Sequence, residues 1–449
     1  MSLPSDSTMH RMSVLSGHLS HGLQHSAAVR RLHSCVPTLT AATARRPGQR
    51  RAVPERRSKP DDVVVVSALR TPIGKAKRGS FKDTRADDLL AAAFKGVLDE
   101  TKLPPERLGD IVVGNVLLPG GGAIQARFAQ FFSNIPETVP INTVNRQCSS
   151  GLQAVINAAG GIKTGVYDVA MAGGVESMTR SPMYQGEDLN PRVLQSQVTQ
   201  DCLTPMGITS ENVAAKFGVT REQQDQMAYE SQKKAAAAQQ KGYFDREIIP
   251  VTTVIQDESG NETEITVTKD DGIRANTTFE GLAKLKPSFS ADGTTTAGNS
   301  SQVSDGAAAV LMASRAAAES LNLPARLVLV SYAVVGVPPA IMGIGPAYAI
   351  PEALKKAGLT TDDIEIFEIN EAFASQAFYC VQKLGIPMEK VNPNGGAIAL
   401  GHPLGCTGSR QVATLLHEME RRGNRAYGVI SMCIGTGMGA AAVFYYPGK

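Results

Sequence analysis

Short β-branched runs and amphipathic stretches alternate along most of this 449-residue chain. The first run, DDVVVVSALRTP from Asp61, is apolar and closed by a turn, as in a buried strand. The stretch 87–99 then places its apolar residues on one helical face. Further strands are predicted at 108–117 and 167–178, with a helix from about Ser149 between them. Strands that alternate with helices predict a parallel or mixed sheet with helices on both faces.

The same order of elements returns in the C-terminal part of the chain. Strands are predicted at 327–336, 363–372 and 427–437, with helices at about 347–357 and from about 407. The run DIEIFEI resembles DIVVGNV in the first part, and YGVISMCIGTG parallels YDVAMAGGVE. We therefore predict an internal duplication with two similar α/β halves.

Residues 183–300, between the two halves, have a different composition. They contain an Ala/Gln/Lys-rich predicted helix (QQDQMAYESQKKAAAAQQKG), a possible hairpin (IIPVTTVIQDESGNETEITV) and a Gly/Thr/Ser stretch. A polar insertion of this length favours a loop domain, which we expect to lie over the first half as a substrate lid. The predicted organisation is a leader at 1–60, a first half at 61–182 completed by about 301–318, this insertion, and a second half at 319–449.

Charge is distributed unevenly along the chain. The net charge is +3, but the first 60 residues hold ten Arg or Lys and only two acids, which gives them +8 and leaves −5 for the rest. The N-terminal segment is thus basic, rich in Ser and poor in acids, whereas the rest of the chain is mildly acidic. This contrast is typical of a targeting segment rather than of a nucleic-acid-binding surface. No run of about 18 apolar residues occurs, so we predict no membrane span.

Histidines and cysteines in the body are few. Five of the seven histidines lie in the leader, which leaves His402 and His417 as candidate bases. His402 stands between Gly401 and Pro403 on a stiff loop, which favours it as a base; His417 is predicted to be solvated in mid-helix. The cysteines form no CxxC pair and no cluster with zinc-ligand spacing, so we predict no metal site. Single, scattered cysteines also favour a reducing compartment. They stand at 35, 148, 202, 380, 406 and 433.

Cys148, in NRQCSSG, directly precedes a predicted helix. The unpaired N–H groups and dipole at a helix start stabilise an anion, so we expect a lowered thiol pKa and a nucleophile. A buried capping cysteine is the alternative.

The stretch SMCIGTGMG places Cys433 at the end of a predicted strand, ahead of Gly435. Its glycines do not match phosphate-binding patterns, so we expect them to give room for a bound group and an N–H donor. Asn370, in NEAFA, follows another predicted strand, and open α/β sheets form their sites at such strand ends. A simple turn at the start of a helix, with Asn370 as its cap, is the alternative. Two thiols, a histidine and an amide at equivalent loops of the two halves suit acyl transfer through a thioester.

Together, NRQCSSGLQAV, GGVESM, NEAFA, GGAIALGHPLGCTG and CIGTGMG resemble the motifs of the thiolase family, in particular its degradative 3-ketoacyl-CoA thiolases of peroxisomes. The resemblance covers about residues 61–446. It implies a thiolase-like α/β fold: two duplicated halves with mixed five-stranded sheets and helices, plus an inserted loop domain. It also implies cleavage of 3-ketoacyl-CoA by CoA to acetyl-CoA and a shortened acyl-CoA, the last step of fatty-acid β-oxidation. CoA is then a substrate, no other cofactor or metal is implied, and the protein is a homodimer.

The resemblance assigns roles to five residues. Cys148 takes the acyl group, and His402 activates Cys148 and helps to hold the thioester oxygen. Asn370 positions a water in that same oxyanion hole. Cys433 is the second acid/base, and the N–H groups of Cys148 and Gly435 form the other oxyanion hole.

The contacts with CoA are implied in the same way. Ser301 would contact the pantetheine, and Arg274 the adenosine phosphates. The stretch PGGGAIQARFAQF at 119–131 differs from the sequence that is usual in the family, so the sequence does not predict the preferred length of the acyl chain.

The leader carries a resemblance of its own. Arg11-Met12, five residues and then His18-Leu19 resemble the type-2 peroxisomal targeting pattern, although Met12 stands where Leu, Val, Ile or Gln is usual. Cys35 could mark a processing point, as in plant-type proteins. A peroxisomal import receptor would then bind the leader; a mitochondrial presequence is the alternative.

Two other functions fit the same motifs. An acetoacetyl-CoA thiolase working toward condensation would use the same residues, because the chemistry is reversible. A non-catalytic acyl-CoA or lipid binder of thiolase fold is disfavoured by the complete set of Cys148, His402, Asn370 and Cys433.

Overall fold

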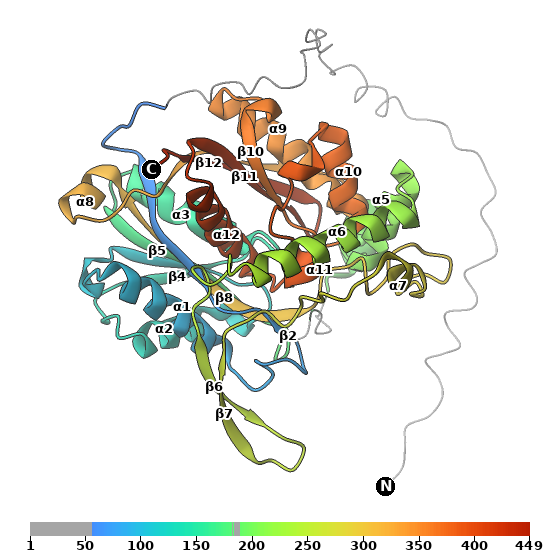
Figure 1. Ribbon diagram of the computed structural model, residues 1–449, viewed down its shortest axis with the longest axis horizontal. Coiled ribbons are helices and arrows are strands. Elements are labelled where there is room, and N and C mark those ends of the chain that lie inside the picture. The colour runs from blue at the N-terminus through green and yellow to red at the C-terminus, as the bar shows by residue number, and fades with distance from the viewer. Residues whose placement is uncertain (1–55, 182, 184–188) are drawn as a thin grey trace. The chain divides into compact units, whose positions relative to one another are not determined.

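The computed structural model describes residues 56–181, 183 and 189–449 (Figure 1). The targeting pattern at 11–19 and the processing point at Cys35 lie outside the described residues. In the part that is described, no helix has both the length and the apolar character needed to cross a bilayer.

One mixed sheet carries both halves of the body, in the strand order β10-β11-β12-β9-β1-β8-β5-β3-β4, with β2 (Gly74–Lys75) paired to β8. The strands of the first half are β1 (Val63–Arg70), β3 (Asp110–Gly114), β4 (Ile141–Val144), β5 (Val169–Ser177) and β8 (Ser304–Ser314). Those of the second half are β9 (Leu327–Gly336), β10 (Ile364–Ile369), β11 (Ala426–Ile434) and β12 (Met438–Tyr446).

The two halves repeat one topology, as the duplicated sequence pattern predicts. In the first half β3 is parallel to β4 and β5, whereas the β5–β8 and β8–β1 pairs are antiparallel. In the second half β10 is parallel to β11, and the β11–β12 and β12–β9 pairs are antiparallel. The position equivalent to β4 holds only a single parallel bridge, from Phe367 to Val391. A short antiparallel ladder between β1 and β9 joins the two expected sheets into one.

Helices cover the sheet and fill the space between the halves. They are α1 (Ala86–Thr101), α2 (Ala123–Phe132), α3 (Ser150–Lys163), α8 (Arg315–Ser320), α9 (Gly345–Ala357), α10 (Ala374–Leu384), α11 (Ala397–Leu400) and α12 (Thr407–Arg422). Short 3₁₀ turns are η3 (Pro105–Arg107), η4 (Pro119–Gly122), η5 (Pro191–Gln195), η6 (Pro339–Ile344), η7 (Thr361–Asp363) and η8 (Met388–Lys390). Helices α3 and α12 pack on each other between the two halves, and strands from both halves share one core with them (Figure 1).

The central position of α12 corrects the prediction for His417. This side chain is buried, and its Nε2 lies 3.2 Å from the main-chain oxygen of Ala68 in β1. Burial lowers its pKa to about 4. The charged residues around it in the sequence suggested a solvated face, but α12 packs against strands and α3 along most of its length.

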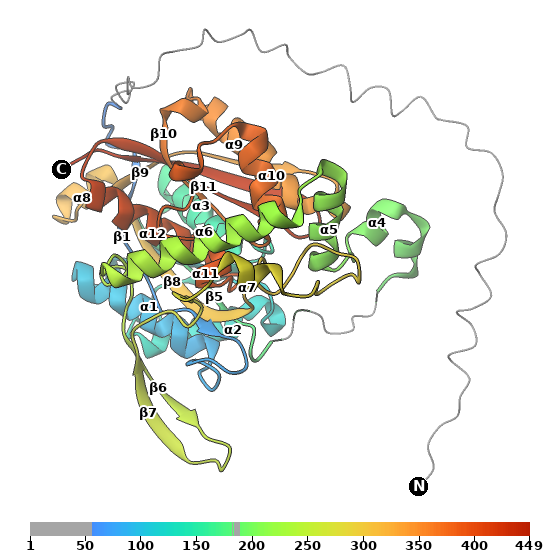
Figure 2. The ribbon, with the colours of Figure 1, turned by 45° about the vertical axis from the view of Figure 1, so that its right-hand side comes forward.

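The insertion forms α4 (Gln197–Asp201), α5 (Met206–Phe217), α6 (Arg221–Gln240), a hairpin of β6 (Val251–Gln256) and β7 (Glu262–Val267), and α7 (Phe279–Ala283). The predicted helix and hairpin are therefore confirmed. Helices α5 and α6 pack against α10, and α6 also contacts α11, so the main helices lie largely over the second half (Figure 2). Ala235 and Ala238 of α6 also pack with Ile73 of the first half. The hairpin joins the core around α1 through the buried Val251 and Val267, and the partly buried Ile265 also packs against this core.

Candidate active site

The candidate residues converge from the ends of elements in both halves. They are Cys148 just before α3, Asn370 just after β10, His402 between α11 and α12, Cys433 near the end of β11, and Gly435 just beyond it. Each position places a polar group where a strand or helix ends, so that groups from both halves can meet.

Cys148 is buried, with 8% of its surface exposed. The N–H of Gly435 donates a hydrogen bond to its sulfur. Burial nevertheless raises the pKa of this thiol to about 11. The expected lowered pKa is therefore wrong, because removing the thiolate from water costs more than the N–H groups around it restore. The resting thiol is neutral.

His402 is buried and held in one tautomer by Thr407, the first residue of α12. The Thr407 hydroxyl lies 2.6 Å from Nδ1 and donates to the main-chain oxygen of Pro403 at 3.0 Å. Because that hydroxyl has one proton to give, it accepts from Nδ1–H, and Nε2 keeps the lone pair. Burial, with a contribution from the charge of Arg410, lowers the pKa of His402 to about 3. The imidazole is therefore a neutral base.

Asn370 connects His402 to the strand ends. Its Nδ2 lies 3.3 Å from His402 Nε2, and its backbone N–H donates to the oxygen of Ser431 in β11 at 2.8 Å. Its Oδ1 is buried and has no hydrogen-bond partner within the described residues. The amide thus has one acceptor position available beside the imidazole.

Cys433 is fully buried among Met342, Ala372 and Phe373. Its sulfur lies 2.5 Å from Oε1 of Gln376. Burial raises the pKa of its thiol well above the usual value, and the neighbouring Cys148 sulfur adds to this. Both thiols are therefore protonated at rest and close enough to influence each other.

Glu176, in the GGVESM motif, holds the histidine loop in place, a role that the sequence did not reveal. Its carboxylate accepts from the N–H groups of Gly405, Val116 and Leu117 and from Nδ2 of Asn115, at 2.9–3.1 Å. Gly405 belongs to the loop that carries His402, so Glu176 ties that loop to the first half. Burial raises the pKa of Glu176 to about 7.

The two candidate CoA contacts lie in different surroundings. The N–H of Ser301 donates to the oxygen of Ala372 at 2.9 Å, so Ser301 stands beside the NEAFA loop. Arg274 is exposed between β7 and α7, and its N–H donates to Gln232 of α6 at 2.8 Å.

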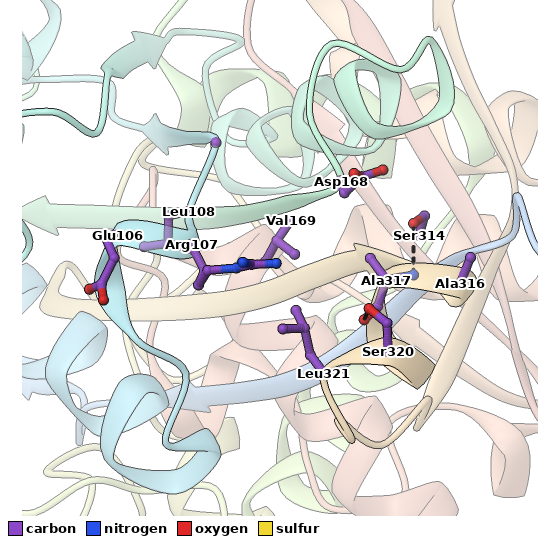
Figure 3. Close-up of a pocket in the computed structure, with 11 residues that line it drawn as sticks. Glu106, Arg107, Leu108, Asp168, Val169, Ser314, Ala316, Ala317, Ser320 and Leu321 are labelled. Atoms are coloured by element: carbon purple, nitrogen blue, oxygen red, sulfur yellow. Dashed lines mark hydrogen bonds between the residues drawn. The ribbon is translucent and has the colours of Figure 1, made fainter.

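A surface hollow of about 540 Å³ lies elsewhere (Figure 3). Arg107, Asp168 and Ser314 are among its lining residues. Asp168 precedes β5 and Ser314 ends β8, whereas the candidate site is at the other ends of these strands, near Glu176 and Ser301. The hollow is therefore separate from the candidate chemistry. Among the residues that the structure describes, no cluster of three or more His, Cys, Asp or Glu could hold a metal ion.

Comparisons with known proteins agree with this geometry. The chain matches the thiolase N-terminal domain over residues 63–316 and the thiolase C-terminal domain over residues 323–446. It is 66% identical over 388 residues to the peroxisomal 3-ketoacyl-CoA thiolase of Homo sapiens, covering 86% of this chain and 92% of that protein. It is 62% identical over 441 residues to the peroxisomal 3-ketoacyl-CoA thiolase A of Mus musculus, covering 98% of this chain and 100% of that protein.

Solved structures show the same fold. The dimeric peroxisomal thiolase of Saccharomyces cerevisiae superimposes with a TM-score of 0.79 at 48% identity, covering 87% of this chain and 98% of that one. The human mitochondrial 3-ketoacyl-CoA thiolase in complex with CoA gives a TM-score of 0.76 at 41% identity, covering 86% and 98%. The chain belongs to the thiolase family, and the predicted thiolase-like fold is confirmed.

Proposed function

We propose that this protein cleaves 3-ketoacyl-CoA with CoA, giving acetyl-CoA and an acyl-CoA shortened by two carbons, as the last step of fatty-acid β-oxidation in the peroxisome. The observation that carries the proposal is the buried assembly of Cys148, His402, Asn370 and Cys433, in a chain whose relatives over nearly its full length are peroxisomal 3-ketoacyl-CoA thiolases.

In the first half-reaction, Cys148 attacks the 3-keto carbon and passes its proton to Nε2 of His402. Burial keeps the imidazole of His402 neutral at rest, so Nε2 has a lone pair to take that proton. The C2–C3 bond then breaks, and its electron pair leaves on C2 of the acetyl-CoA fragment. Cys433 gives its proton to C2, which releases acetyl-CoA and leaves the acyl group on Cys148 as a thioester.

In the second half-reaction, the Cys433 thiolate takes the proton of incoming CoA. The CoA thiolate attacks the acyl thioester, and Cys148 leaves and recovers its proton from His402. The N–H groups of Cys148 and Gly435 stabilise the oxyanion at one carbonyl. Asn370, through a water on its free Oδ1, and His402 stabilise the oxyanion at the other.

Ser301 and Arg274 are the proposed contacts for CoA. Ser301 adjoins the NEAFA loop, as a pantetheine contact must if the thioester is to reach Cys148. Arg274 is exposed, which suits a guanidinium that binds phosphates near the surface. CoA is a substrate in this scheme, and the insertion at 183–300 acts as a lid over the second half.

The reaction is tested with protein that lacks residues 1–35. We expect CoA-dependent cleavage of short and long 3-ketoacyl-CoAs, with the acyl label on Cys148 by mass spectrometry. Cys148→Ser should abolish the acyl-enzyme, and Cys433→Ala should form some but turn over poorly. A label on Cys433 rather than Cys148 would reverse the two roles.

The leader at 1–60 is proposed to direct the protein to the peroxisome through an import receptor. A reporter fused to residues 1–19 should enter peroxisomes, and His18→Ala should prevent this. Mitochondrial import that persists in the His18→Ala fusion would contradict the proposal.

A further inference from the structure

Gln376 contacts both the second cysteine and the loop that carries Asn370. It lies in the first turn of α10 and is 1% exposed. Its Oε1 is 2.5 Å from the sulfur of Cys433, and its Nε2 is 3.2 Å from the main-chain oxygen of Asn370. A single amide therefore bridges β11 and the turn that follows β10.

The two partners fix the orientation of this amide. The main-chain oxygen of Asn370 can only accept a hydrogen bond, so the NH₂ group of Gln376 must face it. Oε1 then faces Cys433 and, since a carbonyl oxygen also only accepts, the Cys433 thiol is the donor. Tight packing allows the side chain little freedom, because a Cβ added at Gly343 would lie 2.5 Å from the Cβ of Gln376.

We infer that Gln376 is a positioning residue that holds Cys433 as an oriented, proton-bearing thiol at a fixed place relative to Asn370. This inference rests on the proposed function, in which Cys433 gives a proton to C2 and later takes one from CoA. A sulfur that is held in one place loses less entropy on reaching the transition state, in which the S–H bond turns from Gln376 toward C2. A carbonyl oxygen beside the sulfur also disfavours the thiolate, so the proton is retained between turnovers.

Two substitutions separate this role from simple packing. Gln376→Met keeps the length of the side chain but removes both hydrogen bonds, so kcat should fall by about 10- to 100-fold. The KM for 3-ketoacyl-CoA should stay within about twofold, because Gln376 acts through Cys433 rather than through the substrate.

Gln376→Glu supplies a pH-dependent rescue. A neutral Glu keeps a carbonyl acceptor for Cys433 and an O–H donor for Asn370, so activity at acidic pH should approach that of the wild type. Its carboxylate has no donor, so kcat relative to wild type should fall by about tenfold or more as pH rises. Because burial raises a carboxyl pKa, this fall should lie above the usual Glu value, within the pH range of the assay.

The matched control is Gln382→Met, since Gln382 is exposed on the same helix. Thermal unfolding of each variant shows whether it has folded. Absence of cleavage by the wild type would refute the proposed function itself. If the wild type cleaves but Gln376→Met keeps its kcat within twofold, or Gln376→Glu is impaired equally at every pH, the inference is wrong. If Gln376→Met does not fold, the pH profile of Gln376→Glu decides.

Discussion

Cys148 sits just ahead of the first turn of α3, yet burial raises the pKa of its thiol to about 11. Alkylation requires the thiolate, whose fraction increases with pH up to that pKa. We therefore expect the rate of Cys148 alkylation by iodoacetamide, without substrate, to rise continuously from about pH 7 to about pH 10. Mass spectrometry of the Cys148 peptide measures this, with the less buried Cys202 as an internal control. A rate that is already constant at neutral pH would show a stable thiolate instead.

Thr407 offers a second test at this scale, because its hydroxyl holds the imidazole in the tautomer that a base needs. Thr407→Val keeps the shape but leaves Nδ1–H without its acceptor, whereas the Pro403 oxygen still accepts from the backbone N–H groups of Cys406 and residue 407. We expect kcat/KM to fall by about 10- to 100-fold, since general base catalysis contributes about 10²–10⁴-fold and only orientation is lost. Thr407→Ser retains the hydroxyl and should keep most of the activity. Equal losses in both variants would show that the methyl group matters rather than the hydrogen bond.

Sequence motifs and element ends led to Cys148, His402, Asn370, Cys433 and Gly435, but not to the residues that hold them. Gln376 and Cys433 are 57 residues apart, and their contact depends on how α10 packs beside β11. The protonation state of the Cys148 thiol could not be predicted either, because the sequence shows the start of the helix but not the burial that raises the thiol pKa.

At the scale of elements, a buried ion cluster fastens the hairpin to the sheet. Arg70, at the end of β1, is fully buried and lies 2.6 Å from Glu247 and 2.7 Å from Asp270. Glu247 precedes β6 and Asp270 follows β7, so both ends of the hairpin are held.

Removing one member of this cluster should be costly, because it leaves a buried charge without its full complement. Asp270→Ala should lower the free energy of unfolding by about 3–5 kcal/mol. Lys95→Ala, which breaks the exposed Lys95–Asp99 pair on α1, should cost less than about 1 kcal/mol. Urea denaturation at one fixed protein concentration compares the two. Similar small losses would mean that the cluster contributes little beyond its packing.

Element predictions succeeded where the local pattern was strong. The β-branched runs of β1 and β9 were predicted, and the β9 bounds coincide with 327–336. The strand β8 was not predicted as such, because SDGAAAVLMAS is rich in alanine, which is depleted in strands. The four-residue β4 is only half-buried and shows no clear pattern.

At the scale of the whole molecule, the duplicated halves give one candidate site rather than two, because a loop of the second half occupies the corresponding space in the first half. Cys406 precedes α12 as Cys148 precedes α3. In the first half, however, Gly174 near the end of β5 meets the loop before Cys406 so closely that a Cβ there would lie 2.2 Å from the oxygen of Gly405. The space at the end of β5 is therefore occupied by protein. In the second half, the end of β11 faces Cys148 through Gly435.

The free edge of the first half is where we expect a second copy of the chain. The sheet ends at β4, and the neighbouring α2 exposes Ile124, Phe128, Phe131 and Phe132. An unpaired edge strand beside an apolar patch is a surface that soluble proteins usually cover. The related Saccharomyces cerevisiae structure is dimeric, which supports a homodimer here.

Charges on this patch should separate the subunits, because each carboxylate would be buried without a partner on association. We expect the double variant Phe128→Glu, Phe132→Glu to sediment as a monomer at concentrations where the wild type is a dimer. Val166→Glu is the matched control, since Val166 is an isolated exposed side chain just beyond α3, and it should leave the dimer intact. A dimer that survives the double substitution would place the interface on another face, and a monomeric wild type would exclude a stable homodimer.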